Sequence, residues 1–164
     1  MTKDAKMLEE NHRRGAEKIE KLLEVGKNVV FLTLGDPTVY ATYLYIHRQV
    51  KKDGFDARII SGVPSFCAAA ASLSEGLVEN SEELHVIPAS YQIEEALKLP
   101  GTKVLMKAGR QMPTVKQFLK ENGCQAVMVE NCGMDTEQKY FSTDEIPDHA
   151  SYYSLIIVKE KRKK

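Results

Sequence analysis

The sequence lacks the features that mark several large classes of protein. It has no apolar run of the 18 or more residues needed to span a bilayer, and residues 1–15 are too polar for a signal peptide. It has no excess of charge, because 23 basic residues balance 23 acidic ones. We therefore expect a cytoplasmic globular protein without a membrane or nucleic-acid partner, and we interpret the basic residues 159–164 as a solvated terminus.

Residues that hold metals or cradle phosphates are also scarce. The cysteines form neither paired clusters nor an even disulfide set, so we expect reduced thiols at Cys67, Cys124 and Cys132. The four histidines share no ligand spacing, and we expect no metal site. No GxxxxGK[ST] occurs and no GxGxxG follows a predicted strand, which argues against a P-loop and against a dinucleotide site.

The spacing of apolar residues predicts an α/β protein. We expect helices over residues 4–25, 38–53, 65–76 and 113–122. We expect strands over residues 28–34, 56–61, 83–88, 102–107, 125–130, 139–143 and 152–160. Strands that alternate with helices in the first half predict a mostly parallel sheet there. The short connection between the last two strands allows an antiparallel pair, which predicts a mixed sheet in the second half.

The polar residues 79–83 interrupt this pattern. We expect them to separate two α/β lobes, one over residues 1–80 and the other over residues 81–164.

The first strand-to-helix turn, "LGDPTVYATY", has two explanations that both remain open. Asp36 is a suitable helix cap and Pro37 a suitable first helical residue, so the turn serves folding alone in one explanation. In the other, Gly35 leaves the backbone bare at the carboxyl end of a parallel strand, where ligands bind in open α/β sheets. The tyrosines that follow then either line a pocket or pack in the core.

A second turn, "SGVPSFCAAAAS", has the same physical features. Gly62 permits a close approach, Pro64 sets the chain direction and Ser65 is placed to cap a helix. The four alanines after it permit either a ligand or a neighbouring strand to come close, and these two interpretations stay open.

Five segments in register resemble the tetrapyrrole methylase family, most closely its precorrin-2 C20-methyltransferase branch. These are "LGDPTVYATYLY", "SGVPSFCAAAASL", "VLMKAGR", "VMVENCGMDTEQ" and "YYSLIIV". The resemblance implies two facing α/β lobes, a dimer, a tetrapyrrole substrate, and S-adenosylmethionine in the cleft between the lobes. Family members begin with a strand and a GxGPGD loop upstream of the segment that matches Met1, so the resemblance also implies a truncated first lobe.

The same resemblance assigns residues to a site. It implies that the cofactor contacts Leu34, Gly35, Asp36, Val39, Ser65, Phe66, Met106, Asn131, Ser154 and Leu155. Asp36 and Tyr40 are the candidate catalytic residues: Asp36 either orients the cofactor or provides a carboxylate charge near the sulfonium, and Tyr40 either positions or deprotonates the substrate, positioning being the favoured role. Lys107, Arg110 and Arg48 are candidate partners for the carboxylates of a tetrapyrrole.

Two other functions remain open. In the first, the chain keeps the fold and the methyl donor but transfers the methyl group to a protein, as in the related diphthine synthases. A non-catalytic α/β module uses the same turns for packing only.

Overall fold

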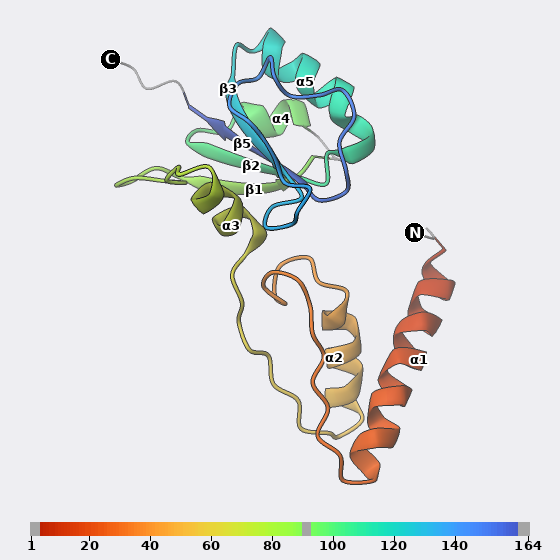
Figure 1. The fold of residues 1–164 in the computed structure, drawn as a ribbon. Helices are drawn as coiled ribbons and strands as arrows, with labels where there is room; N and C mark the ends of the chain where they lie inside the picture. The colour runs from red at the N-terminus through yellow and green to blue at the C-terminus, as the bar shows by residue number, and fades with distance from the viewer. Residues whose placement is uncertain (1–3, 90–92, 161–164) are drawn as a thin grey trace. The chain divides into compact units, whose positions relative to one another are not determined.

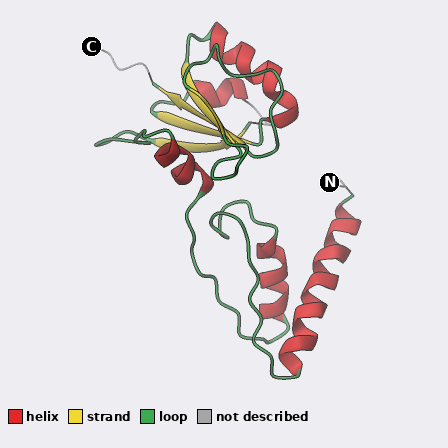
Figure 2. Ribbon diagram, viewed as in Figure 1, coloured by secondary structure: helices red, strands yellow, loops and turns green. Residues whose placement is uncertain are grey.

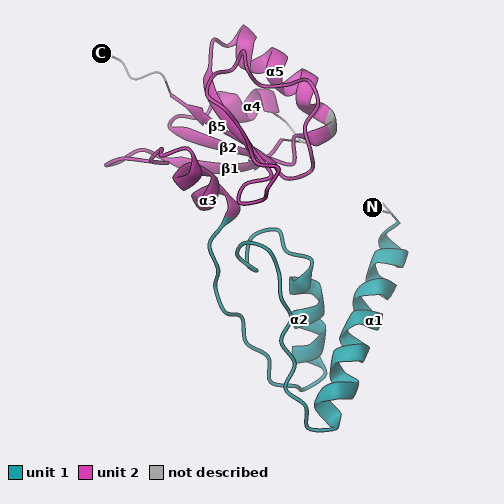
Figure 3. Ribbon diagram, in the orientation of Figure 1, with its two compact units in different colours: residues 1–64 teal, residues 65–164 magenta. Residues whose placement is uncertain are grey.

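The chain forms two compact units, Met1–Pro64 and Ser65–Lys164 (Figure 3). The computed structural model describes residues 4–89 and 93–160. The units meet at Pro64, ahead of the lobe boundary expected near residue 80, because the first helix of unit 2 packs on that unit's sheet. The lobe boundary itself stays a prediction.

Unit 1 is built on a helix pair, α1 (Ala5–Glu24) and α2 (Tyr43–Lys52) (Figures 1 and 2). The carboxylate of Asp4 caps α1 by accepting from the backbone N–H groups of its first turn. Ala16 of α1 is fully buried in a small core with Ile46 and Val50 of α2. The helix predicted over residues 4–25 is confirmed, and its apolar stripe packs against α2.

The two strands predicted in unit 1 do not form. Residues 28–34 and 56–61 run without regular secondary structure, and no ladder joins them to another described segment. Their composition suits a strand, but a strand exists only where a neighbour accepts and donates its backbone hydrogen bonds. The parallel sheet expected in the first half is therefore absent from the described residues.

The helix predicted from residue 38 begins later, at Tyr43. Thr42 occupies the N-cap position and makes no side-chain cap bond. Asp36 is therefore not the cap of this helix, and the capping explanation of the Gly-Asp-Pro turn is wrong.

Unit 2 contains one five-stranded mixed sheet in the order β1-β2-β5-β3-β4. The strands are β1 (Leu84–Pro88), β2 (Thr102–Met106), β3 (Gln125–Glu130), β4 (Gln138–Tyr140) and β5 (Ser154–Lys159). β1 and β2 are parallel, and the other neighbours are antiparallel. The mixed sheet is confirmed, but β4 and β5 pair with opposite edges of β3 rather than with each other.

Helices cover both faces of this sheet (Figure 1). They are α3 (Ser65–Ser72), α4 (Ile93–Leu97), the short 3-10 helix η1 (Gly109–Gln111) and α5 (Met112–Glu121). Alternate residues of β5 face opposite layers, with Ile156 toward α5 and Leu155 toward α3. Ala69 and Ala70 of α3 are buried against the sheet, so these two alanines serve close packing.

Within residues 4–89 and 93–160, no helix has both the length and the apolar character needed to span a membrane.

Glu137 ties α3 to the loop that follows β3. Its carboxylate accepts hydrogen bonds from the Ser72 hydroxyl at 2.8 Å and from the Gly133 N–H at 2.6 Å. Lys139 lies 3.1 Å from the same carboxylate and donates to the Ser72 carbonyl at 2.7 Å. The Gly133 N–H first, then Ser72 and Lys139, lower the pKa of Glu137 to about 2.

We expect Glu137→Gln to destabilise the chain at pH 7 and to change how its stability depends on pH. A carboxyl whose pKa is lowered by folding stabilises the native state above its unfolded pKa, and this stabilisation is lost as the pH falls toward 2. The difference in urea midpoint between wild type and variant should therefore be full at pH 7 and shrink between about pH 5 and pH 2. Glu94→Gln, at an exposed carboxylate of α4, is the control. An equal difference at both pH extremes would contradict the role given to Glu137.

Candidate functional site

Four of the residues implied by the resemblance lie at one end of the strands β2, β5 and β3 in unit 2, which we call the sheet edge. Met106, the last residue of β2, pairs with Leu155 of β5. Ser154 pairs with Glu130 at the end of β3, and the next N–H, that of Asn131, donates to the Tyr153 carbonyl at 3.0 Å. The four residues lie at one edge because β5 runs antiparallel to both β2 and β3, so its start meets their ends.

The backbone turns sharply at this edge. Lys107 and Asn131, which directly follow β2 and β3, have φ values of 60° and 53°. A non-glycine residue in this left-handed region costs of order 1 kcal/mol or more, and such residues cluster at binding and active sites. Two of them, at the ends of the strands on either side of β5, mark this edge as a candidate site.

Hydrogen bonds fix the side chain of Asn131. The Ser151 hydroxyl donates to Asn131 Oδ1 at 2.9 Å, and Asn131 Nδ2 donates to the Thr136 carbonyl at 3.4 Å. Sequence reasoning missed Ser151, because no local pattern links a serine to an asparagine twenty residues earlier.

The hydroxyl of Ser154 has no partner among the described residues. Ser154 is 5% exposed, and its Oγ atom is buried without a hydrogen bond. Buried polar groups in folded proteins are nearly always bonded, so an orphan at a candidate site is a position for a ligand atom or a water molecule.

The first turn of α3 packs on the face of the sheet in unit 2 that carries Leu155 and Met106. Phe66 is half-buried against the cluster that contains Leu155, and Met106 packs against that cluster too. Ser65 is exposed at the first turn of the helix. Six of the ten cofactor residues implied by the resemblance thus belong to unit 2, on its sheet edge and on the helix that packs beside it.

In unit 1, the carboxylate of Asp36 joins the Gly-Asp-Pro turn to the second turn through hydrogen bonds. Its Oδ1 accepts from the N–H of Thr38 at 2.8 Å and from the Thr38 hydroxyl, while Oδ2 accepts from the Gly62 N–H at 3.0 Å. The Thr38 hydroxyl, the Thr38 N–H and the Gly62 N–H together hold the pKa of Asp36 below its ordinary value, against an opposing contribution from burial. Asp36 therefore stays ionised as an acceptor that shapes the turn.

The two turns approach each other more closely than side chains permit. A Cβ atom at Gly62 would lie 2.5 Å from the Gly35 carbonyl oxygen. Glycine at position 62 is therefore required by packing. The pairing of these turns through Asp36 was not foreseen, since 26 residues separate the carboxylate from Gly62.

The other site residues of unit 1 are more open. Leu34 is 74% exposed, Val39 is half-buried and Tyr40 is exposed with φ of 52°. All three residues lie within five positions of Gly35 and Asp36 in the chain, and their contact with a cofactor or substrate stays a prediction.

The candidate cationic residues are spread over the chain. Lys107 is exposed at the sheet edge described above. Arg48 lies on α2, with its guanidinium 6.0 Å from the ring centre of Tyr45. The side chain of Arg110 lies outside what the structure describes. No group of three or more His, Cys, Asp or Glu side chains among the described residues is placed to bind a metal ion.

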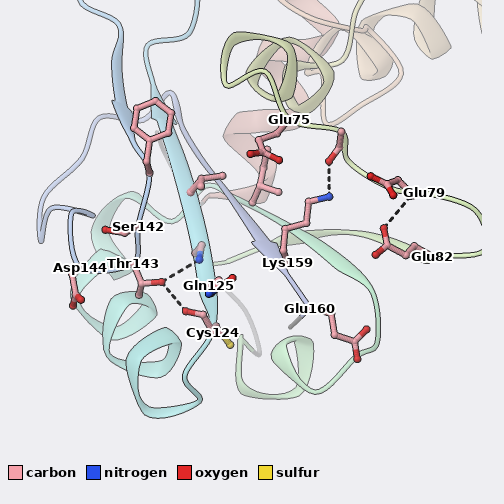
Figure 4. Close-up of a pocket in the computed structure, with 15 residues that line it drawn as sticks. Glu75, Glu79, Glu82, Cys124, Gln125, Ser142, Thr143, Asp144, Lys159 and Glu160 are labelled. Atoms are coloured by element: carbon pink, nitrogen blue, oxygen red, sulfur yellow. Dashed lines mark hydrogen bonds between the residues drawn. The ribbon is translucent and has the colours of Figure 1, made fainter. Parts of the chain in front are cut away.

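A hollow of about 1210 Å³ lies elsewhere in unit 2 and contains none of the predicted site residues (Figure 4). Its floor is formed by the start of β3 and the end of β5, at the opposite end of these strands from Ser154. Carboxylates of Glu75, Glu79, Glu82, Asp144 and Glu160 surround it, and the ammonium of Lys159 is bonded to the Gly76 and Leu77 carbonyls.

Two curated relatives share sequence with this chain. This chain is 35% identical over 89 residues to a probable cobalt-precorrin-2 C(20)-methyltransferase of Methanocaldococcus jannaschii. The matched segment covers 54% of this chain and 39% of the relative. The chain is 28% identical over 152 residues to a precorrin-2 C(20)-methyltransferase of Sinorhizobium sp, covering 90% of this chain and 62% of the relative. The chain thus spans less than two thirds of the length of either relative.

Solved structures share the fold at low sequence identity. The cobalt precorrin-4 methyltransferase CbiF superposes with a TM-score of 0.75 at 19% identity, over 88% of this chain and 69% of that one. Uroporphyrin-III C-methyltransferase from Thermus thermophilus, solved in complex with S-adenosylhomocysteine, superposes with a TM-score of 0.59 at 16% identity, over 77% of this chain and 63% of that one. These likenesses confirm the α/β fold class.

A family model decides the assignment. The model of the Tetrapyrrole (Corrin/Porphyrin) Methylases matches residues 1–146, which is most of the chain and includes both turns, Met106 and Asn131. This chain belongs to the tetrapyrrole methylase family.

Proposed function

We propose that the chain carries the nucleoside-binding part of an S-adenosylmethionine-dependent methyltransferase of cobalamin synthesis, which methylates C20 of precorrin-2 or cobalt-factor II. Family membership and the names of both curated relatives support this function. The fold neighbour CbiF is named for precorrin-4, so the step in the pathway is the finer part of the proposal. A cytoplasmic location and a homodimer complete it.

The single observation that carries the cofactor assignment is the sheet edge of unit 2. Met106, Asn131, Ser154 and Leu155 meet there, and the buried Ser154 hydroxyl has no hydrogen-bond partner among the described residues. An adenosine moiety has the hydroxyls and ring nitrogens that such an orphan group bonds. The residues present therefore fit a nucleoside.

We assign the remaining cofactor contacts to the two bare turns. Leu34, Gly35 and Val39 offer backbone and apolar surface on one turn, and Ser65 with Phe66 begins the helix after the other. Asp36 acts as a positioning residue, because both its carboxylate oxygens already accept hydrogen bonds from the turns. We also propose that its negative charge stabilises the positively charged sulfur of the cofactor.

The proposed methyl transfer requires little of the protein beyond holding the two reactants in position. S-adenosylmethionine, when bound, supplies a methyl group on a positively charged sulfur with a neutral leaving group. Holding two reactants in line contributes up to about 7–11 kcal/mol in well-oriented systems. Tyr40 is proposed to contact the tetrapyrrole, and Lys107, Arg110 and Arg48 to pair with its carboxylates, because cations bind carboxylates through charge-assisted hydrogen bonds.

Removing the orphan hydroxyl with Ser154→Ala tests the cofactor site. Without ligand, the variant should be as stable as wild type or more so, since the lost group makes no hydrogen bond. Its affinity for S-adenosylhomocysteine, measured by calorimetry, should fall about five- to tenfold, the value of one hydrogen bond.

Thr102→Val is the matched control for this measurement. Thr102 also has a buried hydroxyl without a partner among the described residues, but it lies at the other end of the strands, at the start of β2. Its removal should leave the affinity unchanged. Equal losses in both variants would contradict the proposed position of the nucleoside, and no binding by wild type would contradict the cofactor assignment.

The site of methyl transfer tests the substrate assignment. We expect the protein, given precorrin-2 and S-adenosylmethionine with a carbon-13 methyl group, to produce one labelled methyl carbon bonded to C20 in the carbon NMR spectrum. Label at another ring position would assign the chain to a different methylation step. Label on a protein acceptor would favour an enzyme of the diphthine synthase type and contradict the proposal.

A further inference from the structure

The proposed function leaves the acidic hollow of unit 2 without a role. This hollow has a volume of about 1210 Å³ and lies at the end of β3 and β5 away from Ser154. Figure 4 shows Glu75, Glu79 and Glu82 on one side of the hollow and Asp144 on the other. A ligand in the hollow therefore meets negative charge from two sides. We call the carboxylate residues around the hollow the acidic rim, which consists of Glu75, Glu79, Glu82, Asp144 and Glu160.

The floor of the hollow is apolar. Ala126 and Val127 of β3 and Ile157 of β5 contribute to it, and Phe141 lines the hollow with a side chain that is 62% exposed. Lysine and arginine combine an apolar stem with a cationic tip, so their stems pack on apolar surface while their tips reach charged groups. An exposed aromatic ring is a further partner for a cationic tip. The hollow therefore fits a segment rich in lysine and arginine.

The charge of the acidic rim is only partly balanced within the part of the chain that the structure describes. Asp144 pairs with Lys120 at 2.8 Å. By contrast, Glu75, Glu82 and Glu160 form no ion pair with any residue in 4–89 or 93–160. Carboxylates gathered around a concave surface raise the local concentration of cationic groups.

The first residue of the basic run at 159–164 already lies in the hollow. Lys159 is half-buried, and its ammonium donates to the carbonyl oxygens of Gly76 and Leu77, the latter at 2.7 Å. The interpretation of residues 159–164 as solvated is therefore wrong for Lys159. Glu160, the last residue that the structure describes, also lines the hollow. The residues that follow thus start at the acidic rim.

We propose that residues 161–164 bind in the acidic hollow of their own chain. These residues, which we call the basic segment, read Lys-Arg-Lys-Lys and are the only run of four basic residues in the sequence. Four residues span up to ~14 Å when extended, so the basic segment can pass from Glu160 over the floor of the hollow. Its attachment gives it an effective concentration of roughly millimolar at the hollow, which favours it over a free basic partner.

The proposed contact depends on charge. In 0.5 M NaCl the screening length falls to about 4 Å, so the attraction between the basic segment and the acidic rim should weaken there. The proposal does not depend on the methyltransferase assignment, because neither a cofactor nor a substrate takes part in the contact.

Neutralising the basic segment in the full chain tests the proposal. The segment variant carries Lys161→Gln, Arg162→Gln, Lys163→Gln and Lys164→Gln. At low salt it should differ from wild type in the amide resonances of Glu75, Glu82 and Asp144 in nitrogen-15 NMR. These residues lie around the hollow but far from the basic segment in sequence. In 0.5 M NaCl the difference between the two proteins should disappear.

Four exposed lysines of unit 1 provide the matched control. The control variant changes the net charge equally on α1 and α2, through Lys18→Gln, Lys21→Gln, Lys51→Gln and Lys52→Gln. It should leave the three amides in place.

A double-mutant cycle joins the basic segment to the acidic rim. Removing two rim charges with Glu75→Gln and Glu82→Gln should reduce the shift that the segment substitutions cause at Asp144 by more than half, because the effects of interacting groups are not additive. A shift at Asp144 that is unchanged by these two substitutions would contradict the contact.

A free Lys-Arg-Lys-Lys peptide distinguishes the basic segment from another basic partner. Added to the segment variant, the peptide should move the same amides toward their wild-type positions. Wild type should need severalfold more peptide, because its own segment competes. Equal binding to both proteins would show that the hollow is open to another partner. Segment substitutions that move only the amides of Lys159 and Glu160 would show a solvated segment. Absence of any shift in the variant at peptide concentrations above roughly millimolar would also overturn the proposal.

Discussion

The candidate site depends on the central position of β5 in the sheet of unit 2. Because β5 is antiparallel to both neighbours, its first residues lie beside the last residues of β2 and β3. A shift of one residue in this register would exchange the two faces, moving Leu155 away from α3 and Ile156 away from α5. The buried apolar residues on both faces fix the register, and the register brings Met106, Asn131 and Ser154 together.

In unit 1, the geometry of the two turns depends on Asp36. Its carboxylate joins two turns that are distant in sequence, and the close approach of Gly62 to the Gly35 carbonyl follows from that bond. The hydrogen bonds from the Thr38 hydroxyl and N–H, and then from the Gly62 N–H, lower the pKa of Asp36, which suits a fixed anion and not a group that takes up protons during a reaction. The proposed chemistry asks for a fixed geometry around a methyl group, and an ionised, fully bonded carboxylate provides one.

Local pattern predicted those elements that carry their own signal. α1 and α5 have apolar stripes with stop signals, and β3 and β5 are apolar runs between turns. Prediction failed where the outcome depends on distant partners. Residues 28–34 have strand composition without a ladder, and the hydrogen bonds of Asp36 and the orphan state of Ser154 arise only from tertiary contacts. The site residues themselves came from resemblance to a family, since no spacing rule marks the edge at Asn131.

The most direct test of the account is where a nucleoside touches unit 2. Nitrogen-15 NMR of the chain during titration with S-adenosylhomocysteine should show saturable shifts of the amides of Lys107, Asn131 and Leu155. The amides of Gln125 and Lys159, at the acidic hollow on the opposite end of the same strands, should not move. Shifts confined to Gln125 and Lys159 would show that the ligand site lies at the acidic hollow, and would contradict the placement of the nucleoside at the edge beside Ser154.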